Sequence, residues 1–159
     1  MKVAGNKNII LIPCIFGCIV LGSLPTLFST EALQNWFPTI NKPSWNPPNW
    51  LFGPVWTILF LMMGVALWQI IISEHPLKAK ALQWVTIQFI LNMLWTILFF
   101  TLHSPGAAFI EIIFLWLSIN YTIVLYSKIK KSAAYLLLPY ICWVSFAAIL
   151  NATIYWLNR

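Results

Sequence analysis

The chain has 159 residues, of which 61% are hydrophobic and 8% are charged, and its formal net charge is +6. A soluble domain carries about 25% charged residues, and the 3 acidic side chains of this chain cannot solvate a globular surface. The composition therefore excludes a soluble fold and indicates an integral membrane protein. The basic residues are scattered rather than clustered, which argues against nucleic-acid binding.

Five apolar windows are long enough to cross a bilayer core of about 30 Å, which needs about 20 residues per helix. They use nearly the whole chain, so residues 1–159 are expected to form a single membrane domain. The first window follows two lysines, as in a signal peptide, but it lacks an A-x-A cleavage site and is interpreted as a spanning helix. The predicted fold class is an all-α, five-transmembrane-helix bundle with spans at about 9–28, 50–72, 81–102, 107–127 and 133–157.

Small residues repeat along the first predicted span. Cys14, Cys18 and Gly22 follow one another every four residues on one helix face. Such a face lets two membrane helices approach closely, so we expect a packing seam. With Cys142 in the last span, the three cysteines are not a disulfide framework. No histidine or acid stands near Cys14 and Cys18, so we expect no metal site.

The first loop, residues 29–49, is too long to be a simple connector. Its first part, "STEALQNWF", predicts a short interfacial helix with Thr30 as N-cap. Its second part, "KPSWNPPNW", cannot be helical, because its prolines remove backbone donors and fix φ. Lipid cannot satisfy its free polar groups, so we expect a stiff cover over the outer end of the bundle. The residues assigned to this cover are Trp36, Pro43, Trp45, Pro47 and Pro48.

The lysines predict the orientation of the spans. In a five-span topology, the N-terminus and the loops 73–80 and 128–132 share one side. That side holds seven of the nine basic residues, and the other holds Lys42 and Arg159. Because cytoplasmic loops carry the excess of lysine and arginine, we expect the N-terminus in the cytoplasm and the C-terminus outside, with a bacterial cell membrane favoured.

Three spans carry aromatic stripes with polar positions at helical spacing. The stripes are Gly53, Trp56, Phe60 and Gly64; Trp84, Gln88, Asn92, Trp95 and Phe99; and Trp143, Ala147, Asn151 and Tyr155. Amides are costly in hydrocarbon, so the stripes are expected to face the bundle interior. Their convergence beneath the first loop predicts an apolar, aromatic-walled ligand cavity. The alternative is that the amides only bond neighbouring helices and the rings only fill space.

Other polar residues give weaker signals. Glu111 lies about one turn into the fourth span, where an acid is a functional candidate, and we expect it to be shallow enough to reach interfacial water. His75 and His103 lie at span ends without a partner. No Ser–His–Asp set, carboxylate pair or glycine-rich phosphate loop is present, so no catalytic residue and no required cofactor is assigned.

Three segments carry a family resemblance: "KPSWNPPNWLFGPVWTILFLMMG", "LNMLWTILFF" and "LLLPYICWVSFAAILN". Over essentially all five spans, the chain resembles the translocator protein family (TspO/MBR), also called tryptophan-rich sensory proteins and formerly peripheral-type benzodiazepine receptors. The resemblance implies a bundle, often a homodimer, that binds porphyrins such as protoporphyrin IX, sterols and synthetic benzodiazepine-type ligands. It implies a bacterial membrane, or the mitochondrial outer membrane in animals.

The resemblance also assigns roles to single positions. Trp56 in "GPVW" and Trp143 in "PYICW" resemble the two tryptophans tied to porphyrin handling. Asn92 resembles the amide that bonds a synthetic ligand, and Ala147 the small residue that lines the pocket. A sterol pattern in "LNATIYWLNR" is matched by Leu150, Tyr155 and Arg159. The chain departs from the family at Phe37, Ala148 and Ala152, where tyrosine, threonine and an aromatic residue are frequent, which bears on ligand selectivity.

The leading interpretation is a membrane receptor or carrier for hydrophobic planar ligands, above all porphyrins, in tetrapyrrole or stress regulation or transport. The expected ligand-binding residues are Trp56, Asn92, Trp95, Trp143, Ala147, Leu150 and Asn151. Two alternatives stay open. One is a light-dependent porphyrin-degrading enzyme that uses the indoles of Trp56 and Trp143. The other is a sterol-transport scaffold that uses lipid-exposed Tyr155 and Arg159.

Overall fold

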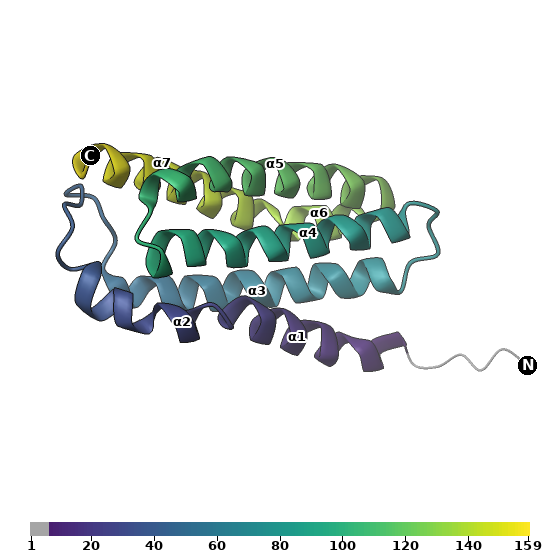
Figure 1. The fold of residues 1–159 in the computed structure, drawn as a ribbon. Coiled ribbons are helices and arrows are strands. Elements are labelled where there is room, and N and C mark those ends of the chain that lie inside the picture. Colours follow the sequence, from purple (N-terminus) through teal and green to yellow (C-terminus); the bar gives the residue numbers. More distant parts are fainter. Residues whose placement is uncertain (1–6) are drawn as a thin grey trace, which may run out of the picture.

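The computed structural model describes residues 7–159, and the described residues form helices, turns and loops without a strand. Five helical stretches are long and apolar enough to cross a membrane, which confirms the predicted fold class. They run up and down side by side (Figure 1). The turns at residues 72–77 and 130 lie at one end, here called the basic end. The first loop and the C-terminus lie at the other end, here called the lid end.

The spans are built from the following elements. The first span comprises η1 (Lys7–Ile10), α1 (Leu11–Ser23), α2 (Thr26–Glu31) and the π-helical η2 (Ala32–Trp36). The second and fourth spans are α3 (Asn49–Ile71) and α5 (Pro105–Ile129). The third consists of α4 (Lys78–Thr96) and the π-helical η3 (Ile97–Thr101). The fifth is divided into α6 (Lys131–Leu136) and α7 (Leu138–Leu157), because Pro139 stands in the first turn of α7.

The first span extends further than the sequence predicts. The expected end at residue 28 and the separate interfacial helix capped by Thr30 are wrong, because the Thr30 hydroxyl donates to the Thr26 carbonyl within α2, at 2.9 Å. Pro25 stands just before α2. Proline has no backbone N–H, and the first residues of a helix need no N–H partner, so proline is well tolerated there. Pro25 therefore starts α2, and the span continues. The non-helical part of the first loop shortens to residues 37–48, here called the lid.

Small residues bring α1 against α3, as the sequence predicts. A Cβ built on Gly64 would stand 2.5 Å from the Cα of Ile15 and 3.0 Å from the Cys14 carbonyl oxygen. A Cβ on Gly22 would overlap the Phe60 ring. The close approach of the two backbones therefore requires glycine at position 64, and the buried Phe60 ring takes the space beside Gly22.

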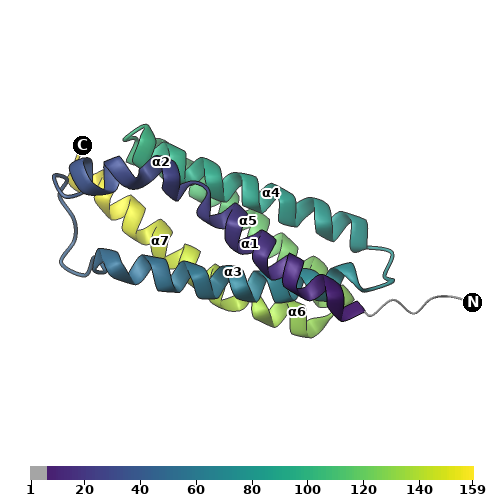
Figure 2. The ribbon, with the colours of Figure 1, turned by 90° about the horizontal axis from the view of Figure 1, so that it is seen from below.

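The helices α3 and α7 do not pack closely along each other. In the described chain α4 packs along α5, α5 packs along α7, and α6 contacts both α3 and α5, whereas α3 and α7 come close at almost no point of their backbones. Figure 2 shows the two helices diverging toward the lid end. The space between them is bridged by side chains, among them Trp56 and Trp143 of the sequence stripes.

Candidate ligand site beneath the lid

The lid is bound to the end of α7 by a reciprocal pair of hydrogen bonds. The Asn41 backbone N–H donates to Asn158 Oδ1 at 2.9 Å, and Asn158 Nδ2 donates to the Asn41 carbonyl at 2.8 Å. Within the lid, the Lys42 ammonium group donates to the carbonyls of Phe37 and Ile40 and lies 4.8 Å from the centre of the Phe37 ring. The lid thus has a defined closed position across the end of the bundle.

The lid prolines shape a turn that leads into α3. The Asn46 N–H donates to the Pro43 carbonyl at 3.0 Å, and Asn46 Nδ2 donates to the Pro47 carbonyl at 2.8 Å. Pro48 is extended, with φ −62° and ψ 143°, and α3 begins at the next residue. This turn places Trp45 edge-on to Phe146 of α7, with 5.9 Å between the ring centres. The lid therefore contributes one aromatic ring to the crevice.

Trp36 does not belong to the lid, contrary to the prediction, because η2 continues the first span through it. Its indole stacks on the His103 ring, with centres 4.5 Å apart and planes at 21°, and meets Phe99 edge-on at 5.8 Å. His103 adopts a positive φ of 47° in the turn after η3. The sequence did not indicate Trp36 as a partner of His103, because two rings that stack 67 positions apart follow no helical spacing.

Six aromatic rings join α3, α7 and the lid, and the space that they border is here called the aromatic crevice. Phe52 and Trp143 lie edge-on with centres 5.7 Å apart, Trp143 and Phe146 are 5.4 Å apart, and Phe146 meets Trp45. Trp56 reaches across to Tyr140 at 6.1 Å. These rings, rather than backbone packing, connect the two helices.

A hollow of about 430 Å³ runs beside these rings between α3 and α7. Its walls are apolar, and they include Val55, Ile58, Pro139, Cys142, Trp143 and Phe146. Ile58 and Cys142 are exposed, so the hollow opens sideways from the bundle, toward the hydrocarbon of a surrounding membrane. An apolar molecule dissolved in the bilayer can reach Trp143 directly from this side.

The two predicted amides bond within the bundle. Asn92 Nδ2 donates to the Tyr140 hydroxyl at 3.1 Å. The Trp95 indole N–H donates to Asn151 Oδ1 at 2.9 Å, and Asn151 Nδ2 donates to the Pro105 carbonyl at 2.7 Å. Asn151 therefore links α4, α5 and α7, and both its oxygen and its amino group have a hydrogen-bond partner.

The predicted ligand-binding tryptophans each contact a neighbouring aromatic ring. Trp143 lines the crevice hollow, Trp56 stacks on Phe60 at 5.2 Å, and Trp95 stacks on Phe99 at 5.3 Å. Ala147 is half-buried and Leu150 is buried. The hollow at Trp143 and a second one at Trp84 open on outer faces of the bundle. That Trp56, Trp95 and Trp143 contact one ligand stays a prediction.

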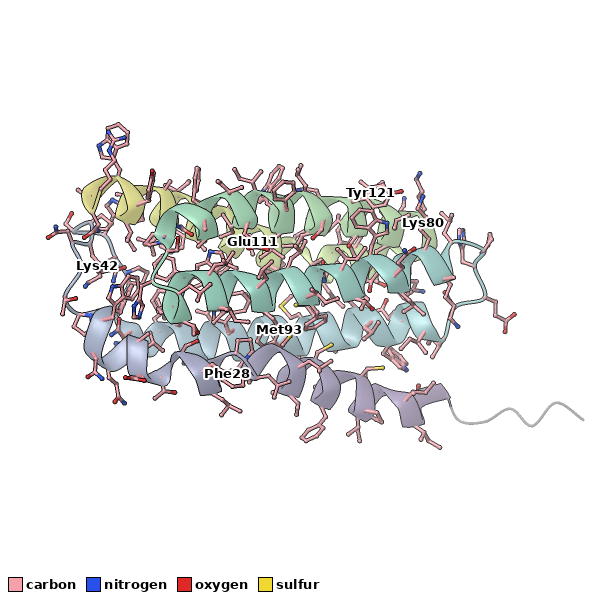
Figure 3. All side chains as sticks on the ribbon, viewed as in Figure 1. Phe28, Lys42, Lys80, Met93, Glu111 and Tyr121 are labelled. Carbon is pink, nitrogen blue, oxygen red and sulfur yellow. The ribbon has the colours of Figure 1, made fainter. Side chains whose placement is uncertain are left out.

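The sequence predicts that Glu111 reaches interfacial water, and this prediction is wrong. Its side chain is 5% exposed, and neither carboxyl oxygen has a hydrogen-bond partner among the described residues. The reason is that Glu111 shares a buried face of α5 with Ala108, Ile112 and Leu115 (Figure 3). On α4, Gln88 is likewise buried without a side-chain hydrogen-bond partner in the described chain. The stripe through Gln88 predicted that this amide faces inward, whereas no stripe in the sequence indicated the same for Glu111.

The residues of the sterol pattern do not share a surface. Leu150 is buried, whereas Tyr155 is 43% exposed. The Arg159 guanidinium lies over the Trp156 ring, 3.1 Å from its centre. A sterol on this helix could therefore contact Tyr155 and Arg159, but not Leu150.

The sequence comparisons agree with this architecture. The model of the TspO/MBR family matches residues 14–157. The tryptophan-rich protein TspO of Chlorobaculum tepidum is 42% identical over 96% of this chain and 99% of its own length. The tryptophan-rich protein TspO of Archaeoglobus fulgidus is 37% identical over 93% of this chain and 96% of its own. The human translocator protein is 32% identical over 73% of this chain and 70% of its own. The chain is an integral membrane protein that belongs to the TspO/MBR family.

Proposed function

We propose that the protein is a membrane receptor or carrier that binds a planar hydrophobic ligand of the porphyrin class against the aromatic crevice. The observation that carries this proposal is the row of rings from Phe52, Trp143, Phe146 and Trp45, which belong to two helices and the lid. The names of the relatives, a sensory protein and a translocator, suit a receptor or carrier. Ligand contact on the lid side would couple occupancy to the position of the lid.

The chemistry of the crevice favours a flat, apolar ligand. Its hollow of about 430 Å³ falls within the range of about 300–1,000 Å³ that is usual for small-molecule sites. Aromatic pairs contribute about 0.5–1.5 kcal/mol each beyond the burial of their area. A macrocycle inserted beside Trp143 would exchange some ring–ring contacts for ring–ligand contacts. The face of the ligand would then be held by several elements at once.

The Asn92–Tyr140 pair gives the site a polar group that a ligand could use. Its hydrogen bond is 3.1 Å long and lies next to Trp56, whose ring meets that of Tyr140. A ligand carbonyl or carboxylate that accepts from Asn92 would replace the Tyr140 hydroxyl oxygen, so one hydrogen bond would be exchanged for another. The exchange leaves one buried hydroxyl, that of Tyr140, to find a new partner, whereas a ligand at Asn151 would break two bonds that link helices.

The test is a titration of the full chain with protoporphyrin IX in detergent, in the dark, followed by the Soret absorbance of the porphyrin. We expect Trp143→Ala to weaken binding about tenfold, because the ligand loses a stacking ring and its buried area, and a factor of ten corresponds to about 1.4 kcal/mol. The matched control is Trp156→Ala, since Trp156 is 63% exposed on the same helix and lies outside the hollow. Equal affinities for the wild type and Trp143→Ala would contradict the proposed site.

A further inference from the structure

A second hollow, of about 550 Å³, lies between α4 and α5 and plays no part in the proposed function. Its walls include Trp84, Ile87 and Leu91 of α4 and Phe114, Leu117 and Tyr121 of α5. The two helices pack along each other, and side chains at these spacings share one face of each helix. We call this hollow the α4–α5 groove.

The groove is open to the membrane and lined by hydrocarbon. Phe114 and Leu117 are 58% and 53% exposed. The Ser118 hydroxyl, which also lies in the lining, is occupied within α5, where it donates to the Leu115 carbonyl at 2.8 Å. Beyond the Trp84 N–H and the Tyr121 hydroxyl at one end, these walls offer no free polar group to an occupant. An apolar chain would fit them without loss.

Cationic side chains stand at one end of the groove. Trp84 and Tyr121 meet edge-on with ring centres 4.7 Å apart, and the Lys80 ammonium group lies 5.4 Å from the centre of the Tyr121 ring. Figure 3 shows Lys80 beside Tyr121 near the basic end of the bundle. Lys128 is exposed and follows Tyr121 by seven residues, or two turns, on the same face of α5. The groove is thus apolar along its length and positive at its mouth.

We propose that the α4–α5 groove binds one acyl chain of an anionic phospholipid, with the lipid phosphate at Lys80 and Lys128 beyond it. From Trp84 to Leu91 the groove extends about 10 Å along the helix, which is most of the hydrocarbon depth of one leaflet, half of about 30 Å. Lysine beside an anionic headgroup binds it electrostatically. A second copy of this chain would instead bring its own basic end toward Lys80, and there Lys78, Lys128, Lys130 and Lys131 outnumber the acid Glu74.

The test is native mass spectrometry of the full chain, released from detergent that contains equal amounts of phosphatidylglycerol and phosphatidylcholine. We expect the wild type to retain one phosphatidylglycerol in preference to phosphatidylcholine. Lys80→Gln should reduce this preference about fivefold, the effect of about one lysine near a lipid surface. Lys131→Gln is the matched control, because Lys131 is exposed at the same end but lies outside the groove. Equal losses in both variants would show diffuse surface attraction and overturn the proposal.

A second pair of variants tests the acyl-chain part of the groove. Leu117→Trp should fill the groove and remove the retained lipid, whereas Ile149→Trp, on the exposed face of α7, should leave it in place. Circular dichroism checks that each variant is folded. Retention of phosphatidylglycerol by a folded Leu117→Trp would contradict the proposal. So would a wild-type dimer that Leu117→Trp dissociates, because a second copy would then be the occupant of the groove.

Discussion

Asn151 connects three helices through one side chain. It accepts from Trp95 of α4 and donates to the Pro105 carbonyl at the start of α5, and it is 1% exposed. Helical spacing had indicated that this amide faces inward, and it does. Spacing could not decide between a ligand and a neighbouring helix as its partner, because both offer the same donors and acceptors. In the structure, both bonds of Asn151 go to neighbouring helices. Asn92 has one described side-chain bond, to Tyr140, and is therefore the amide closer to the crevice rings.

Replacing this linking amide should destabilise the fold. Asn151→Ala removes both interhelical bonds and leaves the Trp95 N–H and the Pro105 carbonyl unpaired. Interhelical hydrogen bonds in membrane proteins average about 0.6 kcal/mol, and unpaired buried groups cost about 1–3 kcal/mol. We therefore expect a loss of about 1–3 kcal/mol in unfolding free energy, measured by denaturation in mixed micelles.

Asn120→Ala is the control for this substitution, because Asn120 Nδ2 bonds the Trp116 carbonyl within its own helix. Its loss of stability should be smaller. If Asn151→Ala were as stable as Asn120→Ala but bound porphyrin more weakly, Asn151 would be a ligand contact after all, as the sequence had suggested.

At the scale of elements, the lid and the end of α7 act as one unit. The chain direction of the lid is set by Pro43, Pro47 and Pro48, which could be interpreted from sequence because proline excludes helix there. Its position over the bundle is set by the Asn41–Asn158 pair, which spans 117 residues and follows no local pattern. The same distinction explains Pro25: proline marks a change in the chain, but whether a helix stops or restarts depends on the packing that follows.

Releasing this pair should speed ligand exchange. Asn158→Ala removes two bonds that hold the lid, each contributing about 0.5–1.5 kcal/mol, so the closed lid loses about 1–3 kcal/mol. We expect protoporphyrin IX to dissociate about tenfold faster, measured by stopped-flow dilution into excess lipid.

Thr39→Ala serves as the comparison for the lid variant, since its hydroxyl bonds only the Trp36 carbonyl three residues before it. It should dissociate at the wild-type rate. An unchanged rate in Asn158→Ala would mean that the ligand leaves without passing the lid, through the open side of the crevice.

For the molecule as a whole, hydropathy predicted five spans that place the loops 73–80 and 128–132 at one end, because the thickness of the lipid acts on every span alike. The small-residue face of α1 at Cys14, Cys18 and Gly22 was predictable, but its partner α3 was not, because that contact lies far along the sequence. The divergence of α3 from α7 was not, because it follows from packing elsewhere: α6 fills the basic end between α3 and α5. The crevice that opens sideways between these two helices was therefore not predicted from the sequence.

The protein's own Cys142 offers the most direct measurement of the central claim, that a planar ligand occupies the α3–α7 crevice. Cys142 is exposed and lines the hollow with Trp143, whereas Cys14 and Cys18 are buried. In a Cys14→Ser, Cys18→Ser background, N-ethylmaleimide should modify Cys142 at a rate that saturating protoporphyrin IX lowers about tenfold, read by intact mass over time. A modification rate that stays the same at saturating porphyrin would place the ligand elsewhere and contradict the account.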